Sequence, residues 1–453
     1  MNAPRSVPGP RLRQSACAHL RSRFVGWITG KDAGYLHPFT APAGWERESL
    51  APYWLEAPDA GSFAEDLCPQ SGPSLAGLAP KQITTPEYAG ILNYAYHLDA
   101  GKLGALLQRH CVERLGVVHR LEEIVRVESS EDGDIRAVHM LSGVRIEADL
   151  FIDCTGLASL LIGKHFGTPL ISRRDVLFVD RAWAAQVPHA EPEAPIASLT
   201  VSTAQSAGWV WDIALPGRRG IGHAYASGYL DDDTALAQLR GYLRERGLPE
   251  EAANARRIDV SPGYRREFWV RNCVAVGLSA GFLEPLEASA IVMVELSAQM
   301  IGNLLPRRRS AMDNAARVFN QAFRYRWERV VEFLKLHYVL SRREDSDFWR
   351  DNRRPESVPA DLAARLQFWQ SQSPWQEEFL HREEVFSAAS YQYVLYGMGF
   401  VSSLPSWTLN EGSRTYAREQ MRAMRERNRE LCAALPPHRE LLERISRYGL
   451  QRI

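Results

Sequence analysis

The chain has 453 residues, enough for two or three domains or for one large two-lobed unit. It is 45% hydrophobic and 24% charged, which is typical of a soluble globular protein. Its 54 Lys and Arg residues equal its 54 Asp and Glu residues, so the strongly basic surface of a nucleic-acid-binding protein is excluded.

The sequence predicts a cytoplasmic protein that binds neither nucleic acid nor membrane. Six cysteines are scattered without a CxxC pair, as expected for reduced thiols, and we expect no metal site. No apolar run approaches the roughly 18 residues that a membrane helix requires. Residues 1–13 lack the apolar core of a secretory signal.

The N-terminal part predicts few regular elements. Residues 1–23 show little pattern, and residues 24–39 are aromatic and strand-like. Residues 40–80 hold six prolines and are expected to form a long irregular segment, of the kind that is usually functional or flexible. Apolar side chains at helical spacing predict a helix from Tyr88 to Leu115.

Strands dominate the middle of the chain. Short apolar runs between residues 116 and 153 predict a meander that ends in a parallel core strand at Asp153. Between residues 170 and 230, including the run 176–179, apolar and polar residues alternate more openly, which suits an antiparallel sheet. A helix is expected after this sheet, at 231–246. From residue 290 onward the pattern predicts helices almost throughout.

The most informative segment is Gly277–Ile291. It follows the apolar run Cys273–Val276, which predicts a buried strand, and its small residues let the backbone pass close to a ligand. The helix that begins next leaves its first N–H groups without internal partners, which makes a cradle for an anion or cofactor. Glu284 and Glu287 flank Pro285 beside this cradle, and we interpret the paired carboxylates as evidence of chemistry.

Two further motifs have both a structural and a functional interpretation. Trp209-Val-Trp-Asp-Ile213 places two indoles on one face of a strand, either in the core or as an aromatic wall over a flavin or along a channel. His37-Pro-Phe39 is either a fixed turn or part of a binding site. A third motif, Leu150-Phe-Ile-Asp-Cys-Thr-Gly156, is a strand closing in a glycine turn, as where a doubly wound flavoprotein returns to its dinucleotide.

Seven motifs then occur in a fixed order: Phe24-Val-Gly-Trp27, Tyr35-Leu-His-Pro-Phe39, Ala95-Tyr-His-Leu-Asp-Ala100, Phe151-Ile-Asp-Cys-Thr-Gly156, Gly208-Trp-Val-Trp-Asp-Ile213, Gly281-Phe-Leu-Glu-Pro-Leu-Glu287 and Arg343-Glu-Asp-Ser-Asp-Phe-Trp349. Each is short, but in this order they resemble the flavin-dependent tryptophan halogenase family. The resemblance runs from about residue 24 to at least residue 400.

The resemblance implies an α/β fold, namely the FAD-binding doubly wound (Rossmann-like) fold of flavoprotein monooxygenases with an antiparallel substrate sheet and a helical C-terminal lobe. It assigns residues 24–165 and 260–305 to the FAD-binding domain, 166–259 to the substrate sheet and 306–453 to the helical lobe, after the poorly patterned 1–23.

The implied reaction is halogenation of an aromatic substrate, either tryptophan or another indole, pyrrole or phenol. It uses O₂, chloride or bromide, and reduced FAD supplied by a separate flavin reductase. The hypohalous acid that forms crosses a short tunnel to the substrate, and the protein keeps water away from it. The implied partners are therefore the reductase and a small aromatic molecule, and the resemblance also admits a homodimer.

The family's catalytic positions carry over onto named residues. Glu287 matches the glutamate that accepts or orients the proton lost on substitution. Ser289 and Ala290 match the halide contacts, mainly through backbone N–H groups at a helix start. His37 and Phe39 match the pair that encloses the substrate ring.

The cofactor and channel positions carry over in the same way. The implied FAD contacts are Ile124 on the adenine side and Leu278, Gly281 and Ile291 in the cradle segment. Trp209 and Trp211 match the tryptophan pair that is typical of halogenases rather than hydroxylases, and are expected to form the channel wall.

The chain departs from the family pattern at two important places. It has no GxGxxG near its start, so we expect the first βαβ unit of the fold to be missing. The family's essential lysine, eight residues before Trp27, is replaced by His19, whose imidazole is shorter and usually neutral. In addition, Ala288 stands where the family usually has serine.

Three hypotheses remain open. In the first, the chain is a halogenase whose recorded start is wrong, and upstream DNA encodes the missing unit. In the second, it is a flavin-dependent monooxygenase or oxidoreductase that lost halide chemistry through His19 and Ala288, and its products are oxygenated but never halogenated. In the third, it is an inactive remnant that stays colourless with FAD.

Overall fold

The computed structural model describes residues 16–250, 254–379, 381, 384–404 and 409–451. Its largest sheet has seven strands, in the order β14 (Arg256–Asp259), β10 (Arg181–Pro188), β13 (Arg218–Tyr225), β12 (Gly208–Ala214), β11 (Thr200–Gln205), β2 (Arg21–Val25) and β3 (Tyr35–Pro38). All neighbouring strands are antiparallel except β11 and β2, which are parallel.

Four smaller sheets complete the strand layers. They are β18 (Gly281–Phe282), β15 (Gly263–Arg265) and β9 (Leu170–Ser172); β16 (Trp269–Val270), β17 (Cys273–Ala275) and β8 (Phe151–Asp153); β5 (Ile124–Ser129), β6 (Ile135–Met140) and β7 (Arg145–Glu147); and β1 (Ala16–His19) with β4 (Ala95–Leu98). β8 and β17 are parallel neighbours, which confirms the predicted parallel strand that ends at Asp153.

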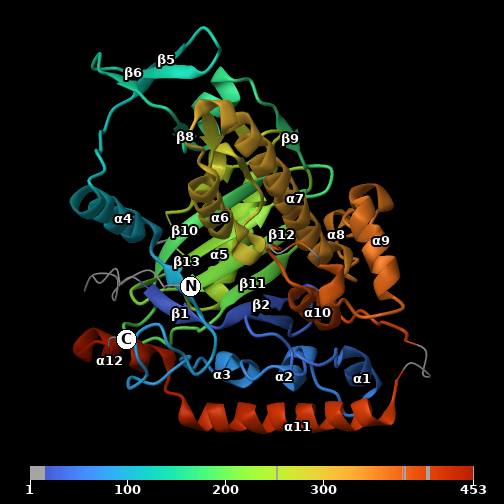
Figure 1. Cartoon of the computed structure of the whole chain (residues 1–453). Coiled ribbons are helices and arrows are strands. Elements are labelled where there is room, and N and C mark those ends of the chain that lie inside the picture. The colour runs from blue at the N-terminus through green and yellow to red at the C-terminus, as the bar shows by residue number, and fades with distance from the viewer. Residues whose placement is uncertain (1–15, 251–253, 380, 382–383, 405–408, 452–453) are drawn as a thin grey trace.

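Helices cover these sheets. They are α1 (Ala51–Glu56), α2 (Phe63–Leu67), α3 (Ser71–Leu75), α4 (Ala100–Leu115), α5 (Asp232–Glu245), α6 (Ser289–Leu304), α7 (Met312–Val339), α8 (Asp347–Asp351), α9 (Ala360–Trp369), α10 (Ala388–Gly397), α11 (Glu411–Ala434) and α12 (His438–Tyr448). In Figure 1, α11 runs beneath α1, α2 and α3, and α7 crosses the middle of the molecule. The mixed α/β fold with a helical C-terminal part is confirmed. Within the described ranges, none of these helices combines the length and apolar character needed to cross a bilayer.

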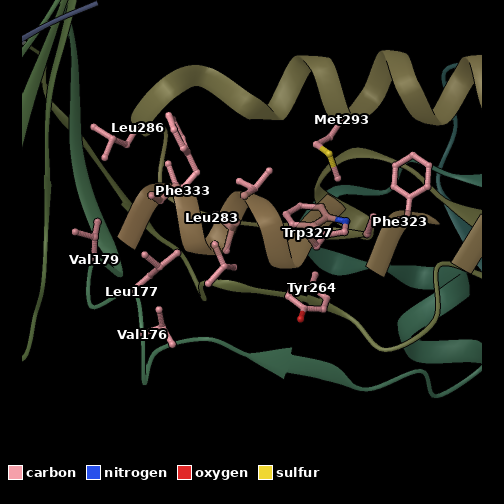
Figure 2. Packing of buried hydrophobic residues seen from close by; sticks show 14 of the residues in the cluster. Val176, Leu177, Val179, Tyr264, Leu283, Leu286, Met293, Phe323, Trp327 and Phe333 are labelled. Atoms are coloured by element: carbon pink, nitrogen blue, oxygen red, sulfur yellow. The ribbon is translucent and has the colours of Figure 1, made fainter. Parts of the chain in front are cut away.

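The main hydrophobic core forms around α7. Phe323 and Trp327 of this helix lie near Met293 of α6 and Tyr264 of β15, whereas Phe333 lies nearer to Leu283 and Leu286 (Figure 2). Leu283 and Leu286, which flank Glu284 and Pro285, insert into the same cluster and are 5% and 0% exposed. The segment that carries the two glutamates is therefore fixed by apolar packing on both sides of Glu284.

The two faces of the large sheet bury different layers. Val210 of β12 packs against Leu239 and Leu243 of α5. Because side chains alternate along a strand, its neighbour Trp209 points to the opposite face, into the cluster around α7. This alternation places the predicted tryptophan pair on the side of the sheet that holds the glutamates.

Two expectations for the N-terminal part are wrong. Residues 40–80 are not irregular throughout, because α1, α2 and α3 form within them; each has only five or six residues, too few for a helical period to show in the sequence. The helix expected within 88–115 begins only at Ala100. The residues before it form β4, which pairs with β1, and Asp99 caps the helix by accepting the Lys102 N–H.

Other strand boundaries also differ from the prediction. Residues 176–179 form no strand; Val176, Leu177 and Val179 are buried, and their side chains fill the core beside α7. Residues 16–23, which showed little pattern, contribute to β1 and β2, whereas 1–15 lie outside the described residues. The large sheet also recruits β2 and β3 from outside the range 166–259. The domain limits stay a prediction.

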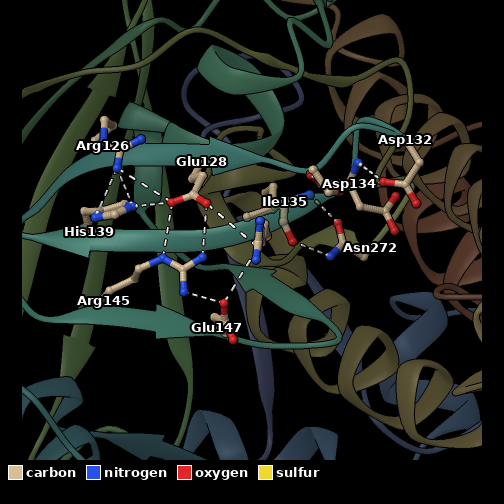
Figure 3. A network of polar contacts seen from close by, with 11 residues as sticks. Arg126, Glu128, Asp132, Asp134, Ile135, His139, Arg145, Glu147 and Asn272 are labelled. Atoms are coloured by element: carbon tan, nitrogen blue, oxygen red, sulfur yellow. Dashed lines mark hydrogen bonds and ion pairs between the residues drawn. The ribbon is translucent and has the colours of Figure 1, made fainter.

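The β5–β7 sheet lies at the top of Figure 1, and Ile135 and Val138 of β6 join the main hydrophobic core. Asn272, in the turn between β16 and β17, attaches it by exchanging two hydrogen bonds with the backbone of Ile135, at 2.8 and 2.9 Å. Figure 3 shows this contact beside an exposed cluster in which Glu128 is surrounded by His139 and several arginines. Ile124, the predicted adenine contact, is the first residue of β5.

Candidate active site

The predicted cradle is a strand, a turn and a helix start, as the sequence indicated. β17 ends at Ala275, a short 3₁₀ turn covers Gly277–Ser279, and α6 begins at Ser289. The last two residues before the helix, Glu287 and Ala288, have left-handed backbones with φ of 60° and 52°. Such conformations cost about 1–3 kcal/mol per non-glycine residue and persist only where the surroundings enforce them.

The Glu287 side chain is held between two histidines. Its Oε1 lies 2.8 Å from Nδ1 of His37 on β3 and 3.2 Å from Nε2 of His337 on α7. The other ring nitrogen of His337, Nδ1, is hydrogen-bonded to the Tyr35 hydroxyl. The Glu287 side chain is only 5% exposed. These contacts join three elements that are far apart in the sequence and enforce the unusual backbone at Glu287.

The histidines keep the Glu287 carboxylate ionised. Burial alone raises the pKa of this carboxyl, but the charges and hydrogen bonds of His37 and His337 outweigh it and lower the pKa to about 2. Burial in turn lowers the pKa of His337. Nε2 of His337 faces the carboxylate, and Nδ1 of the same ring faces the Tyr35 hydroxyl. A buried carboxylate of this kind can accept a proton and share it with a neighbouring imidazole.

Glu284 is buried in a second network. Its Oε2 accepts hydrogen bonds from Nε1 of Trp209 at 2.8 Å and from the Tyr338 hydroxyl at 2.6 Å. Burial raises the pKa of its carboxyl to about 7, against the effect of these two bonds. Lys335, one turn before Tyr338, is buried as well, and burial lowers the pKa of its ammonium group to about 7. The two glutamates of one motif thus have pKa values driven in opposite directions.

The predicted tryptophan wall is an assembled cluster. The Trp209 and Trp211 rings lie edge to face with centroids 6.1 Å apart, and Trp27 lies 6.4 Å from Trp209. Gly222 on the neighbouring strand makes room for Trp211, because a Cβ there would meet the indole at 2.1 Å. Trp209 is buried, whereas Trp211 is only partly covered.

The predicted flavin positions have differing environments. Leu278 and Ile291 are 44% and 63% exposed, so two large apolar side chains face outward at the turn and at the start of α6. Gly281 is buried, and a Cβ there would lie 2.6 Å from the Gly263 oxygen, so strand pairing with β15 already requires glycine. Ile124 is partly buried on the separate β5–β7 sheet.

The predicted halide positions lie at the positive end of α6. Ser289 is buried, Ala290 is exposed, and the capping residue Ala288 makes no side-chain hydrogen bond to the first turn. The N–H groups of the first turn therefore lack a side-chain cap, and the helix dipole favours negative charge beside them. Ala288 thus leaves free donors that a serine at the cap would compete for.

His19, at the position of the family lysine, is packed among other rings. It stacks on His97 with centroids 3.9 Å apart and meets the edge of Phe39 at 5.0 Å. Burial lowers its pKa to about 4, so the ring is neutral at pH 7. Phe39 itself is 44% exposed, while His37 is buried against Glu287.

Sequence reasoning missed the α7 half of the site. His337 and Tyr338 are adjacent on α7, and each contacts one of the two glutamates. The available signal was the run 335–338, in which polar residues interrupt an apolar stretch of a long helix. A helix buried on most sides must give such residues partners, but the pattern does not say which.

Comparison with known proteins shows which proteins this chain is similar to. The tryptophan halogenase family matches residues 13–410. The 7-chloro-L-tryptophan 6-halogenase of Kutzneria sp. (strain 744) is 34% identical over 85% of this chain and 73% of its own length. The structure of the tryptophan halogenase of Shewanella frigidimarina has a TM-score of 0.93 at 40% identity, covering 98% of this chain and 85% of that one. A flavin-dependent halogenase of Brevundimonas sp. BAL3 has a TM-score of 0.84 at 30% identity, over 96% and 88% of the two chains.

Proposed function

Because this chain belongs to the tryptophan halogenase family, we propose that it halogenates an aromatic substrate, using reduced FAD, O₂ and chloride or bromide. The observation that carries the proposal is the Glu287 carboxylate, ionised and buried between His37 and His337 at the start of α6. A substrate of the tryptophan, indole, pyrrole or phenol class is the kind on which such a base acts.

Glu287 acts as the proton acceptor. In electrophilic substitution the ring carbon forms a bond to the halogen of hypohalous acid and hydroxide leaves; the ring carbon then loses its proton, and that proton, once released from the site, converts the hydroxide into water. The Glu287 carboxylate takes the ring proton, and His37 and His337 are close enough to hold it afterwards. Positioned acid–base groups of this type contribute about 10²–10⁴ in rate.

The residues of the cradle fit a flavin and a halide. When bound, reduced flavin would react with O₂, and this reaction would supply the oxidising equivalents that convert halide into hypohalous acid. The exposed apolar side chains of Leu278 and Ile291 provide a surface for the ring system. The uncapped first turn of α6, with Ser289 and Ala290, offers N–H donors to the anion. A separate flavin reductase supplies the reduced cofactor.

His19 favours a second candidate function. An ammonium group at this position can hold hypohalous acid, whereas a neutral imidazole stacked on His97 has no charge to contribute. The chain would then be a flavin-dependent monooxygenase that oxygenates the same substrate class without halogenating it. The two functions differ in their products.

The test uses the purified full chain with FAD, a flavin reductase, NADH and a panel of indoles, pyrroles and phenols. Reactions run with and without bromide, and the products are identified by mass spectrometry. We expect a bromine isotope doublet only when bromide is present. Oxygenated products that do not depend on bromide would establish the monooxygenase instead, and the absence of both products would reject both functions.

A further inference from the structure

The mechanism above does not use Glu284, the other buried carboxyl group of the motif that carries Glu287. Glu284 is 2% exposed, its Oε2 receives both hydrogen bonds, and its Oε1 is buried without a hydrogen-bond partner among the described residues. The nearby buried cation, Lys335, donates instead to Oδ1 of Asn352 at 2.8 Å. Glu284 is therefore not retained for a direct ion pair, and its contacts are the two donors Trp209 and Tyr338.

The two glutamates hold the same stretch of α7. Glu287 contacts His337, and Glu284 contacts the next residue, Tyr338. Leu286 between them is fully buried in the core. The segment from 284 to 287 is thus fixed to α7 at two successive positions, so any displacement of Glu284 moves the left-handed residue Glu287.

Glu284 also sets the orientation of the indole wall. An indole has a single donor, Nε1–H, and in Trp209 that donor is directed at Glu284. Trp27 uses its own Nε1–H for the Ser202 carbonyl at 2.9 Å, and its ring lies 5.3 Å from the Tyr338 ring. Glu284 is therefore bonded both to the wall and to the helix that holds Glu287.

We propose that Glu284 is a positioning residue for halogenation: through Trp209 and Tyr338 it keeps the indole wall and the Glu287 segment in register, so that oxidised halide reaches the substrate. The inference rests on the proposed function. It predicts that loss of the two hydrogen bonds affects the delivery of halogen more than the binding of substrate, because the reacting groups shift while the pocket remains.

The experiment measures coupling, which is the halogenated product formed per reduced FAD consumed, in the full chain. Hypohalous acid that escapes is trapped by an added thioether and counted as sulfoxide. Glu284→Leu removes both acceptors, and Glu284→Gln retains one amide oxygen that both donors can reach. Tyr338→Phe removes a single bond without leaving a cavity, and serves if the Leu variant does not fold.

Glu332→Gln is the matched control. Glu332 lies on α7, is equally buried and has its carboxyl pKa raised to about 7 by burial, but it pairs with Arg329 and does not contact Trp209. Glu332 therefore resembles Glu284 in its burial and charge, but it does not lie between the indole wall and the Glu287 segment. We expect coupling in this variant to equal that of the parent chain.

For Glu284→Leu we expect coupling to fall about tenfold or more, with a matching rise in sulfoxide and a substrate KM within about threefold of the parent. Glu284→Gln recovers most of the loss, and Tyr338→Phe shows a smaller loss of the same kind. The Trp209 indole N–H resonance, assigned with Trp209→Phe, shifts in the Leu variant and not in the Glu332 control. This signal does not depend on turnover.

Two failures are distinguishable. The inference is overturned, and the proposed function stands, if the parent halogenates and Glu284→Leu stays as well coupled as the parent. Where the Leu variant does not fold, Tyr338→Phe takes its place in this comparison. An equal loss in the Glu332 control also overturns it, because burial alone would explain the effect. If the parent forms no halogenated product, the proposed function fails and the inference fails with it.

Discussion

Glu287 and Glu128 both contact histidine, but one carboxylate lies in the core and the other at the surface. Glu287 lies in the core between His37 and His337, and its side chain is 5% exposed. Glu128 lies on the exposed β5–β7 sheet, 2.7 Å from His139 and 3.0 Å from Arg145, and its side chain is 24% exposed (Figure 3). Both carboxyl pKa values are lowered to about 2.

Burial weighs very differently in these two pKa values. At Glu128, hydrogen bonds from Arg145 and His139 lower the pKa with little burial to oppose them. At Glu287, burial raises the pKa and the histidines must outweigh it. Water screens the surface cluster, so its contacts contribute little to stability. The buried carboxylate is held dry in one geometry, and this difference in setting, rather than the pKa itself, indicates a catalytic base.

The largest expected effect is that of Glu287→Gln on turnover. The amide keeps the shape of the side chain but cannot take the ring proton, so kcat is expected to fall about 100-fold or more. The measurement is the rate of product formation at saturating substrate and bromide. The thermal midpoint of the variant serves as the control for folding. A variant with the parent's kcat would show that another group accepts the proton.

A smaller loss is expected for His337→Gln. This change removes one of the two imidazoles that share the proton with Glu287, while His37 remains at 2.8 Å. We expect kcat to fall about tenfold, within the range for general acid–base groups. Tyr35→Phe, which removes only the hydroxyl bonded to the far nitrogen of His337, should change kcat less. A larger fall in kcat for Tyr35→Phe than for His337→Gln would contradict the arrangement in which His337 contacts the carboxylate and Tyr35 contacts only His337.

The unfolding free energy of the parent, compared with Glu284→Gln, should depend on pH. The folded pKa of Glu284, about 7, lies above the unfolded value of roughly 4.3, so folding favours the protonated form. Its contribution is complete below the unfolded pKa and is lost as pH rises through 7. Glutamine does not titrate.

The parent should therefore lose about 2 kcal/mol relative to Glu284→Gln between pH 5 and pH 8. Denaturant unfolding at both pH values measures this difference. Lys335 on α7 faces the same region, and the Glu284 charge raises its pKa, so the measured difference includes the shift of Lys335 in the glutamine variant. A constant difference between the two chains would mean that Glu284 has no raised pKa in the folded state.

The smallest effect is expected at the surface cluster. Glu128→Gln removes a carboxylate that contacts His139 and Arg145 in water, so the thermal midpoint should shift by less than about 2 °C. The shift should shrink further at high salt, because added ions screen these charges. A large, salt-independent shift would place Glu128 among the structurally important residues.

The sequence predicted those parts of the fold that depend on local pattern. The strand at Cys273–Ala275 and the start of α6 at Ser289 were located within one or two residues, because an apolar run and a change to helical spacing mark them. The helices α1–α3 were missed because five or six residues show no period. β4 was read as helix because its pairing with β1 lies 80 residues away in the sequence.

Only the part of the site that lies in the motif with Glu284 and Glu287 could be predicted from the sequence. Glu284 and Glu287 were singled out by their spacing around a proline. Their partners come from elsewhere: His37 is 250 residues from Glu287, and Tyr338 is 54 residues from Glu284. No local pattern connects residues over such separations, since tertiary packing alone brings them together.

The most direct test of the account measures Glu287→Gln and Glu128→Gln in one bromination assay. Both changes replace a glutamate whose carboxyl pKa is lowered to about 2 by the same isosteric amide. If the buried setting makes Glu287 the base, its variant is slower by about 100-fold or more and the Glu128 variant matches the parent. Equal rates in the two variants would contradict the assignment of Glu287 as the proton acceptor.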